Sequence, residues 1–585
     1  MKPILPLLLL ALAGCASVGE VVQMPPGVAA ADQELGAGHA REAAQAYAAL
    51  ALGSTGTQHD VLEERAANAW QQAGDPKAAR HAYAAIVEPK RLNGDDGLRF
   101  RLLGAEFMII DGHTAQAAAQ LDVADAAIPQ SLAARWYRAH AIALEAAGDK
   151  FDAAASLALL EPMQSKQAAA TTRAHIHRLL TSVDDATLAS GTAALPLGHP
   201  LYNDAGHMLT ARGLPLPHPY ARVASAQPVS TRPPADEDGY RPPLKVALLL
   251  PSTGSVAVAA SAVRDGFMTA YFAESRRRPE VHVYDSADSA GGAIAAYRKA
   301  VADGDDFVVG PLGREQVKAL FEQSEVPVPI LALNRSSQPA PPGSVSFSLA
   351  PEDEGVAAAH RLLGKGLRRA IAFTARDENA VRALAAFREA YAQRGGSVVA
   401  EGVIADAGPN YGAILKEALA ASNDQYDAIF LALKAPAARL LATQLPTNGY
   451  RPVPRESTSL ILSGGGNARL DQELDGIEYP ELAWLLHPVN GLPDASSLGS
   501  HLPTARGGGA RLFAFGADAY RLSAYLDSLA ASPEATLHGA TGELRLDGLG
   551  NVARGSEWAV FSGGRGRPAQ DGALQSEPVR SGGTR

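Results

Sequence analysis

The sequence predicts a multidomain protein in which an all-α repeat domain precedes an α/β domain of two lobes. Three observations support this prediction. Glycines recur at intervals of 36, 38 and 36 residues in an alanine-rich region, prolines then concentrate over residues 214–243, and strands alternate with helices in two series beyond that point. At 585 residues the chain is longer than one hydrophobic core usually supports, so separate domains are expected.

The first domain is expected over residues 30–213, where apolar residues recur at helical spacing. Each repeat has a glycine able to adopt positive φ at a turn, then one or two polar residues and an alanine-rich helix. The repeats are marked by Gly38, Gly74, Gly112 and Gly148. Their spacing resembles that of tetratricopeptide arrays, which stack as solenoids and usually bind proteins or act as spacers. A compact helical bundle without repeat geometry is the alternative.

Residues 214–243 contain eight prolines among Ser, Ala, Arg and acidic residues and are interpreted as a linker. Because proline stiffens the chain and removes backbone donors, we expect no packed element in this segment. The composition then changes at once. Residues 245–250 read Lys-Val-Ala-Leu-Leu-Leu, an apolar run typical of a strand buried on both faces of a parallel sheet.

Two series of strands and helices follow, and such alternation indicates parallel sheets with right-handed crossovers. Because the alternation runs twice, two lobes are expected. The first series comprises strands at 245–250, 281–285, 307–311 and 329–333 and helices at 256–273, 290–302 and 315–322. The second comprises helices at 352–363, 380–394 and 411–420 and strands at 369–373, 397–403, 428–432 and 460–462.

Three motifs in this half resemble the type I periplasmic-binding-protein fold, the Venus-flytrap architecture of bacterial solute receptors. KVALLLPSTG with AVRDGFMTAY is similar to its first strand, loop and helix, and DFVVGPLGREQVKAL to its third strand and helix. GATGELRLDGLGNVARGSEWAVFSGG is similar to its C-terminal hairpin. The order of the three motifs supports the resemblance over residues 244–564. The Gly- and Arg-rich tail at 565–585 is expected to be disordered.

The chain has a single cysteine, Cys15, which follows a cationic start and a short apolar run. Residues 1–14 are interpreted as a secretory signal peptide, since the run is too short to span a bilayer. The motif LAGC resembles a bacterial lipobox, which implies cleavage before Cys15, acylation of its sulfur and amino group, and a tether over 15–29. The residue that follows is Ala16 rather than aspartate, which in lipoproteins implies sorting to the outer membrane. An unmodified free cysteine is the alternative.

Composition and motifs argue against nucleic-acid binding and against catalysis. The 52 basic and 62 acidic residues give a formal charge of −10, which disfavours a general nucleic-acid surface. No G-x-S-x-G, S-x-x-K or H-E-x-x-H motif occurs, so we expect no enzyme, metal or cofactor. Three weaker features are interpreted as structural, with partner docking as the alternative for the last. They are a glycine-rich turn at 463–467, His175 with His177 on a helix, and the run Arg276–Arg278 at a helix end.

Flytrap folds bind ligands at the carboxyl ends of their strands. The hydroxyl groups and the arginine at this edge could hold a carboxylate, which makes these side chains a candidate cleft rim. Polar residues are also ordinary at the strand ends of any soluble α/β fold. The candidate rim residues are Ser252, Thr253, Asp285, Ser286, Asn334 and Arg335, with Pro311 and Leu312 at the same edge.

Lipobox, repeat domain, proline-rich linker and C-terminal flytrap domain together resemble the LppC family of outer-membrane lipoproteins. The resemblance implies a non-catalytic protein that is anchored by lipid in the outer membrane and faces the periplasm. It also implies docking on a class A penicillin-binding protein, a bifunctional peptidoglycan synthase, whose cross-linking step the family stimulates. The alternative hypothesis is a lipid-anchored solute receptor that delivers an amino acid or a peptidoglycan fragment to a transporter.

Overall fold

The computed structural model describes residues 24–212, 214–218, 232–254, 256–323, 325–336, 338–405, 410–532 and 535–569. They form two compact units, which divide between Val183 and Asp184. Cys15 with its lipobox, and residues 570–585 of the expected tail, lie outside the described residues. In the described ranges, no helix combines the length and the apolar character that crossing a membrane requires.

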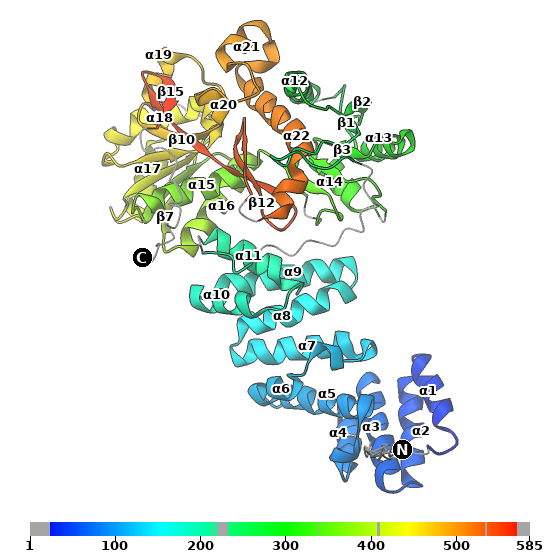
Figure 1. Cartoon of the computed structure of the whole chain (residues 1–585). Helices are drawn as coiled ribbons and strands as arrows, with labels where there is room; N and C mark the ends of the chain where they lie inside the picture. The colour runs from blue at the N-terminus through cyan, green and yellow to red at the C-terminus, as the bar shows by residue number, and fades with distance from the viewer. Residues whose placement is uncertain are drawn as a thin grey trace, which may run out of the picture. The chain divides into compact units, whose positions relative to one another are not determined.

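The first unit consists of helices that pack on their neighbours in sequence, drawn in blue and cyan in Figure 1. Four helical hairpins, α1–α2, α3–α4, α5–α6 and α7–α8, are followed by α9, which packs on α8. This arrangement confirms the predicted all-α repeat domain. The helices are α1 (Val28–Gly36), α2 (Ala40–Leu52), α3 (Gly56–Gln72), α4 (Pro76–Ala85), α5 (Gly94–Ile110), α6 (Thr114–Leu121), α7 (Gln130–Ala147), α8 (Lys150–Leu160) and α9 (Lys166–Ser182).

The glycines that mark the predicted repeats lie at the turns inside the four hairpins. All four adopt the left-handed conformation, in which a residue with a side chain would be strained. Their φ angles are 87° at Gly38, 74° at Gly74, 81° at Gly112 and 97° at Gly148. The repeat spacing in the sequence is therefore the spacing of these turns.

The second unit begins with α10 (Asp185–Ala194) and α11 (Leu201–Ala211). Because the proline-rich segment begins only at residue 214, we expected both helices to belong to the helical domain, over residues 30–213. The two helices instead belong to the same compact unit as the α/β domain. On α11, the side-chain amide of Asn203 donates to the carbonyl oxygen of Gly548 at 2.9 Å. A run of prolines shows where regular structure stops; it does not show on which domain the preceding helix packs.

The last part of the predicted linker is packed. Residues 232–243 contain no helix or strand, yet the Tyr240 side chain is only 3% exposed. The Arg241 N–H donates to the carbonyl of Ala524 at 2.8 Å, and the Arg276 guanidinium lies 3.7 Å from the centre of the Tyr240 ring. These residues therefore lack a helix or strand, as expected, but they are packed on the α/β domain through buried aromatic and charged contacts.

The first lobe contains an eight-stranded sheet with the order β11-β12-β13-β5-β4-β3-β1-β2. Strands β1 to β5 are parallel, as the alternation predicts, whereas β12 pairs antiparallel with both β11 and β13. The strands are β1 (Lys245–Leu250), β2 (Glu280–Asp285), β3 (Phe307–Val309), β4 (Ile330–Ala332), β5 (Val345–Phe347), β11 (Leu537–Gly539), β12 (Gly542–Leu546) and β13 (Asn551–Gly555). The helices are α12 (Ala257–Ala273), α13 (Ala290–Asp303), α14 (Arg314–Phe321), α21 (Ala495–His501) and α22 (Gly508–Ala531).

The second lobe contains a seven-stranded sheet with the order β15-β14-β10-β9-β8-β6-β7. Strands β6 to β10 are parallel, and β14 and β15 add an antiparallel edge. The strands are β6 (Arg369–Thr374), β7 (Ser397–Val403), β8 (Ala428–Ala432), β9 (Arg455–Ser457), β10 (Ile477–Glu481), β14 (Glu557–Ser562) and β15 (Arg565–Pro568). The helices are α15 (Pro351–Gly364), α16 (Glu378–Gln393), α17 (Gly412–Ala421), α18 (Ala435–Thr447) and α19 (Ala468–Asp471). The short helix α20 (Ala483–Leu486) follows β10 but packs Trp484 into the core of the first lobe.

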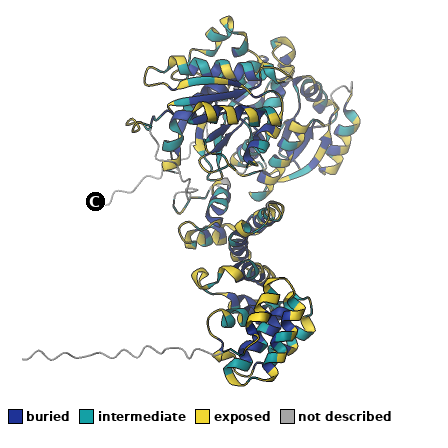
Figure 2. Cartoon of the chain, turned by 90° about the vertical axis from the view of Figure 1, so that its right-hand side faces the viewer, coloured by how far each residue is buried: buried dark blue, intermediate teal, exposed yellow. Residues whose placement is uncertain are grey.

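The parallel strands form the cores of the two lobes, and Figure 2 shows them as buried ribbons among partly exposed helices. Every residue of β8 is buried, and β1 is buried from Val246 to Leu250. Helices on both faces of a sheet require such continuous apolar runs. The predicted two-lobed α/β fold is confirmed.

The strand expected at 460–462 is wrong. Residues Ser459–Leu462 form a 3-10 helix, and the strand lies earlier, at β9. The Thr458 hydroxyl oxygen accepts the N–H of Leu460 and ends the extended conformation there. An apolar run of three residues cannot distinguish the two conformations.

The tail also begins later than the expected residue 565. Strand β15 pairs antiparallel with β14 across a turn at Gly563 and Gly564, whose φ angles are 61° and 69°. Two consecutive residues with positive φ are typical of a tight hairpin turn. The two turn N–H groups donate to the Asp475 carboxylate at 2.9 Å, which fixes the hairpin on the second lobe.

Candidate functional site

Four of the predicted rim residues lie together at the carboxyl ends of β1 and β2. The Ser252 N–H donates to the Asp285 carboxylate at 3.0 Å, and its hydroxyl donates to the same group. This hydroxyl bond, with backbone N–H bonds, holds the pKa of Asp285 below its ordinary value. Ser286 is buried, and its hydroxyl donates to the Ala287 carbonyl at 3.3 Å, while Thr253 is exposed. The Asp285 carboxylate thus already accepts hydrogen bonds from neighbouring residues of the chain.

The other two rim residues follow β4 and make a separate set of contacts. The Asn334 amide donates to the Leu312 carbonyl at 2.9 Å, and its oxygen accepts the N–H of Arg335 at 3.0 Å. The Arg335 guanidinium forms an ion pair with Asp353, on the first turn of α15, at 2.7 Å. Burial raises the pKa of Asp353, and Arg335 opposes that shift. Arg335 therefore joins the two lobes and is not a free receptor for a carboxylate.

A second bridge joins the lobes at the carboxyl ends of their strands. Arg314, at the start of α14, donates to Glu378, at the start of α16, at 2.8 Å. Helix α14 follows β3 of the first lobe and α16 follows β6 of the second. The sequence carries no signal of this pair, because a charged residue in the first turn of a helix is common and does not indicate a partner in another lobe.

The chain passes three times between the lobes, and a buried ionic cluster lies at these passages. Glu354 on α15 accepts the hydroxyl and the N–H of Ser459, at 2.6 and 2.8 Å. Arg511 on α22 donates to Glu354 at 3.0 Å and also to Glu481 at the end of β10. A helix of the first lobe thereby holds two carboxylates of the second, so breaking this cluster would leave buried charges unpaired.

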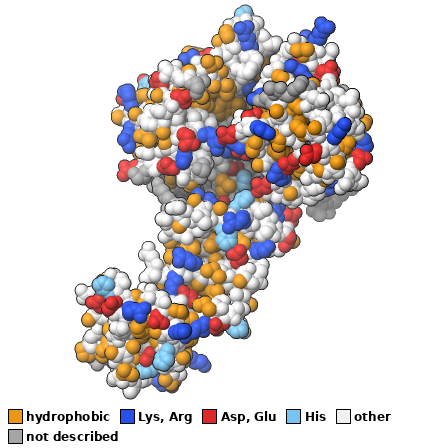
Figure 3. All heavy atoms as spheres, turned by 180° about the vertical axis from the view of Figure 1, so that it is seen from behind, with side chains coloured by type: hydrophobic (Ala, Val, Ile, Leu, Met, Phe, Trp, Pro, Cys, Tyr) orange, Lys and Arg blue, Asp and Glu red, His pale blue; other side chains and the backbone are white. Residues whose placement is uncertain are grey.

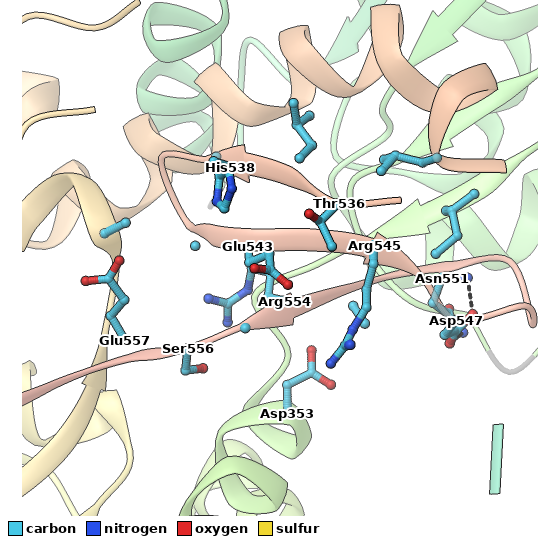
Figure 4. A pocket seen from close by; sticks show the side chains of 18 of the residues that line it. Asp353, Thr536, His538, Glu543, Arg545, Asp547, Asn551, Arg554, Ser556 and Glu557 are labelled. Atoms are coloured by element: carbon cyan, nitrogen blue, oxygen red, sulfur yellow. Dashed lines mark hydrogen bonds between the residues drawn. The ribbon is translucent and has the colours of Figure 1, made fainter. Parts of the chain in front are cut away.

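A cavity of about 1490 Å³ lies beside these passages. It is lined by parts of α11, α15, α20 and α22, by strands β11 to β13 and by the loop at 487–490. Of the predicted rim residues, only Arg335 lines it. Figure 4 shows its polar lining, with Glu543 and Arg545 on β12, Arg554 on β13 and Asp353 on α15. No sequence pattern indicates this cavity, since its walls come from segments far apart in the chain.

The weaker sequence features have structural roles. His175 pairs with Glu145 at 3.0 Å. Arg276 binds Glu274 and Asp238, each at about 3 Å, and stacks on Tyr240, so it holds the end of the predicted linker. In the glycine-rich turn, the Gly466 N–H donates to Asp471 at 2.7 Å. In the part of the chain that the structure describes, no group of three His, Cys, Asp or Glu side chains has the geometry to hold a metal ion.

The visible face of the α/β unit carries charges of both signs. Figure 3 shows basic and acidic side chains interspersed there, with histidines in the middle of the view. Mixed charge of this kind fits the formal charge of −10 and differs from the basic stripe of a nucleic-acid surface.

Comparison with known proteins identifies a family and several similar proteins. The model of a family described as "LppC putative lipoprotein" matches residues 240–407 and 410–564. Penicillin-binding protein activator LpoA from Photobacterium profundum is 29% identical over 353 residues, which are 56% of this chain and 57% of that protein. The chain thus spans a little over half the length of the curated relatives it matches.

Two solved structures from Haemophilus influenzae are also similar. Full-length LpoA is 18% identical with a TM-score of 0.49, over 90% of this chain and 97% of that chain. The LpoA C-domain, described as a regulator of PBP1A, is 22% identical with a TM-score of 0.49, over 56% of this chain and 99% of that chain.

Proposed function

The chain belongs to the LppC lipoprotein family, and from this premise we propose that it is an outer-membrane lipoprotein that binds and activates a class A penicillin-binding protein. The activation raises peptidoglycan cross-linking, and the chain itself is not catalytic. Cys15 carries the lipid, and the protein faces the periplasm. The family match over more than half of the chain is the observation that carries the proposal.

The names of relatives support the activator hypothesis. The curated relatives are named activators, and the similar C-domain from Haemophilus influenzae is described as a regulator. The family match covers the α/β unit. We therefore assign the contact with the synthase to the α/β unit.

The geometry of the cleft favours a regulator over a solute receptor. A receptor needs side chains whose polar atoms are free to bind the solute. Here Asp285 accepts from Ser252, and Arg335 is paired with Asp353. The exposed ion pair between Arg314 and Glu378 also spans the two lobes at the strand ends, where it contributes little free energy on its own. A solute would have to displace these contacts before it could bind.

The proposed mechanism is a shift in the conformational population of the synthase. A bound protein changes an equilibrium only if it binds one state more tightly than the other, so the α/β unit must bind the active form of the synthase preferentially. A tenfold difference in affinity between the two forms corresponds to about 1.4 kcal/mol. No reaction on this chain is needed.

The decisive experiment adds the protein from Ala16 onward, without lipid, to the class A synthase of the same organism. Cross-linking of labelled lipid II is followed with and without the protein, and direct binding is measured in parallel. We expect saturable binding and increased cross-linking that disappears when the synthase is blocked with penicillin. Absence of both binding and stimulation would overturn the proposal and direct attention to the solute-receptor alternative.

A further inference from the structure

We propose that the cavity beside the lobe passages binds an organic anion through Arg521, Arg545 and Arg554. This site goes beyond the proposed activator function and does not depend on it. The cavity is lined by both lobes and by α11, and the three arginines lie on α22, β12 and β13 of the first lobe.

The acidic side chains that line the cavity are already paired, with one exception. Among the acidic lining residues, all of which the structure describes, only Glu543 has no hydrogen bond or ion pair. The pairs are Glu352 with Arg382 (2.7 Å), Asp353 with Arg335 (2.7 Å), Asp238 with Arg276 (2.9 Å), Glu557 with His487 (2.7 Å) and Asp547 with the N–H groups of Leu549 and Asn551 (2.8 and 2.9 Å).

Three guanidinium groups of the same lining lack such partners. Across the described ranges, Arg521 and Arg545 make no hydrogen bond or ion pair, and Arg554 makes one, to the Thr541 carbonyl at 3.3 Å. The Nη1 atom of Arg521 and the Nε and Nη2 atoms of Arg554 are buried without an acceptor. A buried donor without an acceptor costs free energy, and more so when it is charged. These atoms therefore favour a ligand that supplies oxygen acceptors.

Nearby carboxylates do not satisfy these donors. Asp353 and Asp518 act on Arg554 electrostatically, but their oxygens are held by other groups. Asp518 accepts from the N–H groups of Ala540 and Thr541 and from the Thr541 hydroxyl, at 2.6 to 2.7 Å. The Asp353 carboxylate is held in its ion pair with Arg335. Three cations against the single carboxylate of Glu543 leave the unpaired charge of the lining positive.

The geometry and the size of the cavity define the chemical class of the ligand. A guanidinium fork matches the two oxygens of a carboxylate or phosphate group. In Figure 4, Arg545 and Arg554 extend from the neighbouring antiparallel strands β12 and β13, and Asp353 faces them from α15. The volume of about 1490 Å³ far exceeds that of a bare ion, and Leu529, Leu537 and Trp558 add apolar wall. An organic molecule with a carboxylate or phosphate group and an apolar portion fits this lining.

The test measures binding to the protein from Ala16 onward by calorimetry and by thermal shift. The probes are tri-alanine with a free carboxylate, the same peptide with a C-terminal amide, and inorganic phosphate, each compared with sodium chloride at equal ionic strength. We expect tri-alanine or phosphate to raise the midpoint of unfolding, since selective binding to the native state stabilises it. A response to tri-alanine alone identifies a carboxylate ligand, and a response to phosphate alone a phosphorylated one. If neither anion differs from chloride, the proposal is wrong.

Variants then locate the site. Arg521→Gln should weaken binding by about tenfold or more, the amount expected for loss of a charged hydrogen bond. Glu543→Gln, at an exposed position, should strengthen binding because it removes the unpaired carboxylate. This variant is preferred to a substitution of the half-buried Arg554, which would disturb folding. Arg567→Gln, an exposed arginine on β15 outside the cavity, is the matched control and should bind as the wild type does. Unchanged affinity in both Arg521→Gln and Glu543→Gln would refute the site. Because no synthase is present, this outcome is independent of the activator proposal.

Discussion

Glu456 illustrates how burial sets the behaviour of a single charged residue. It lies on β9 with no exposed surface, 3.1 Å from the Lys365 ammonium group and 3.9 Å from the Arg361 guanidinium. Its second carboxylate oxygen has no hydrogen-bond partner among the described atoms. Burial raises the pKa of Glu456 to about 8, and the two cations only partly oppose this. A carboxyl group with a raised pKa takes up a proton when the chain folds.

This uptake predicts a loss of stability with rising pH. The contribution of Glu456 to the free energy of unfolding is fully present below its ordinary pKa of 4.5 and is lost as the pH rises through its folded-state pKa of about 8. In between, the free energy of unfolding should fall by up to about 1.4 kcal/mol per pH unit. Glu456→Gln cannot ionise, so we expect it to lose less stability than the wild type between pH 5 and pH 8 in urea denaturation. Glu417→Gln, at an exposed position on α17, should follow the wild type. Parallel curves for Glu456→Gln and the wild type would contradict the prediction.

At the level of elements, local patterns predicted β1 to β4 and β6 to β8 but missed β5, β9 and β10, and they predicted the tertiary partners poorly. The expected strands at 397–403 and 428–432 match β7 and β8, because continuous apolar runs between turns carry their own signal. Helix α22 was not predicted. The rim residues do lie at strand ends as expected, but Glu354 and Arg511 are 157 residues apart, and no local pattern links them. Pairings of this kind depend on the assembled fold.

The contact between α12 and α22 gives a testable case. A Cβ atom at Gly266 would lie 1.9 Å from the Phe513 carbonyl oxygen, and one at Gly516 would lie 1.9 Å from the Val263 carbonyl oxygen. Because backbone cannot move aside as a side chain can, Gly266→Ala and Gly516→Ala should each lower the free energy of unfolding by about 1–3 kcal/mol.

The matched control is Gly291→Ala on α13, where an added Cβ would meet no atom within 4 Å. Alanine is the better helix former, so this variant should be unchanged or more stable by about 0.5–1 kcal/mol. Urea denaturation of the three variants measures the difference. Equal stability of Gly266→Ala and Gly291→Ala would show that the helices do not need the close approach.

At the level of the whole molecule, the proposal combines three parts with different physical roles. The acylated Cys15 holds the chain at the membrane, the helical repeats provide a stack whose length grows with repeat number, and the α/β unit binds the partner. One acyl chain binds a membrane only marginally, at about 0.8 kcal/mol per buried methylene, whereas two or more anchor a protein stably. The membrane attachment should therefore depend on one residue.

Fractionation of cells that express single variants tests this dependence. Cys15→Ala removes the lipidation site, so we expect the protein to be lost from the outer-membrane fraction. Ala16→Asp keeps the lipid but introduces the residue that retains lipoproteins at the inner membrane, so it should move from the outer to the inner membrane on a density gradient. Ser17→Ala changes neither signal and should remain with the wild type in the outer membrane. Outer-membrane recovery of Cys15→Ala equal to that of the wild type would mean that some other contact holds the chain there, and the lipid would then be unnecessary to the proposed function.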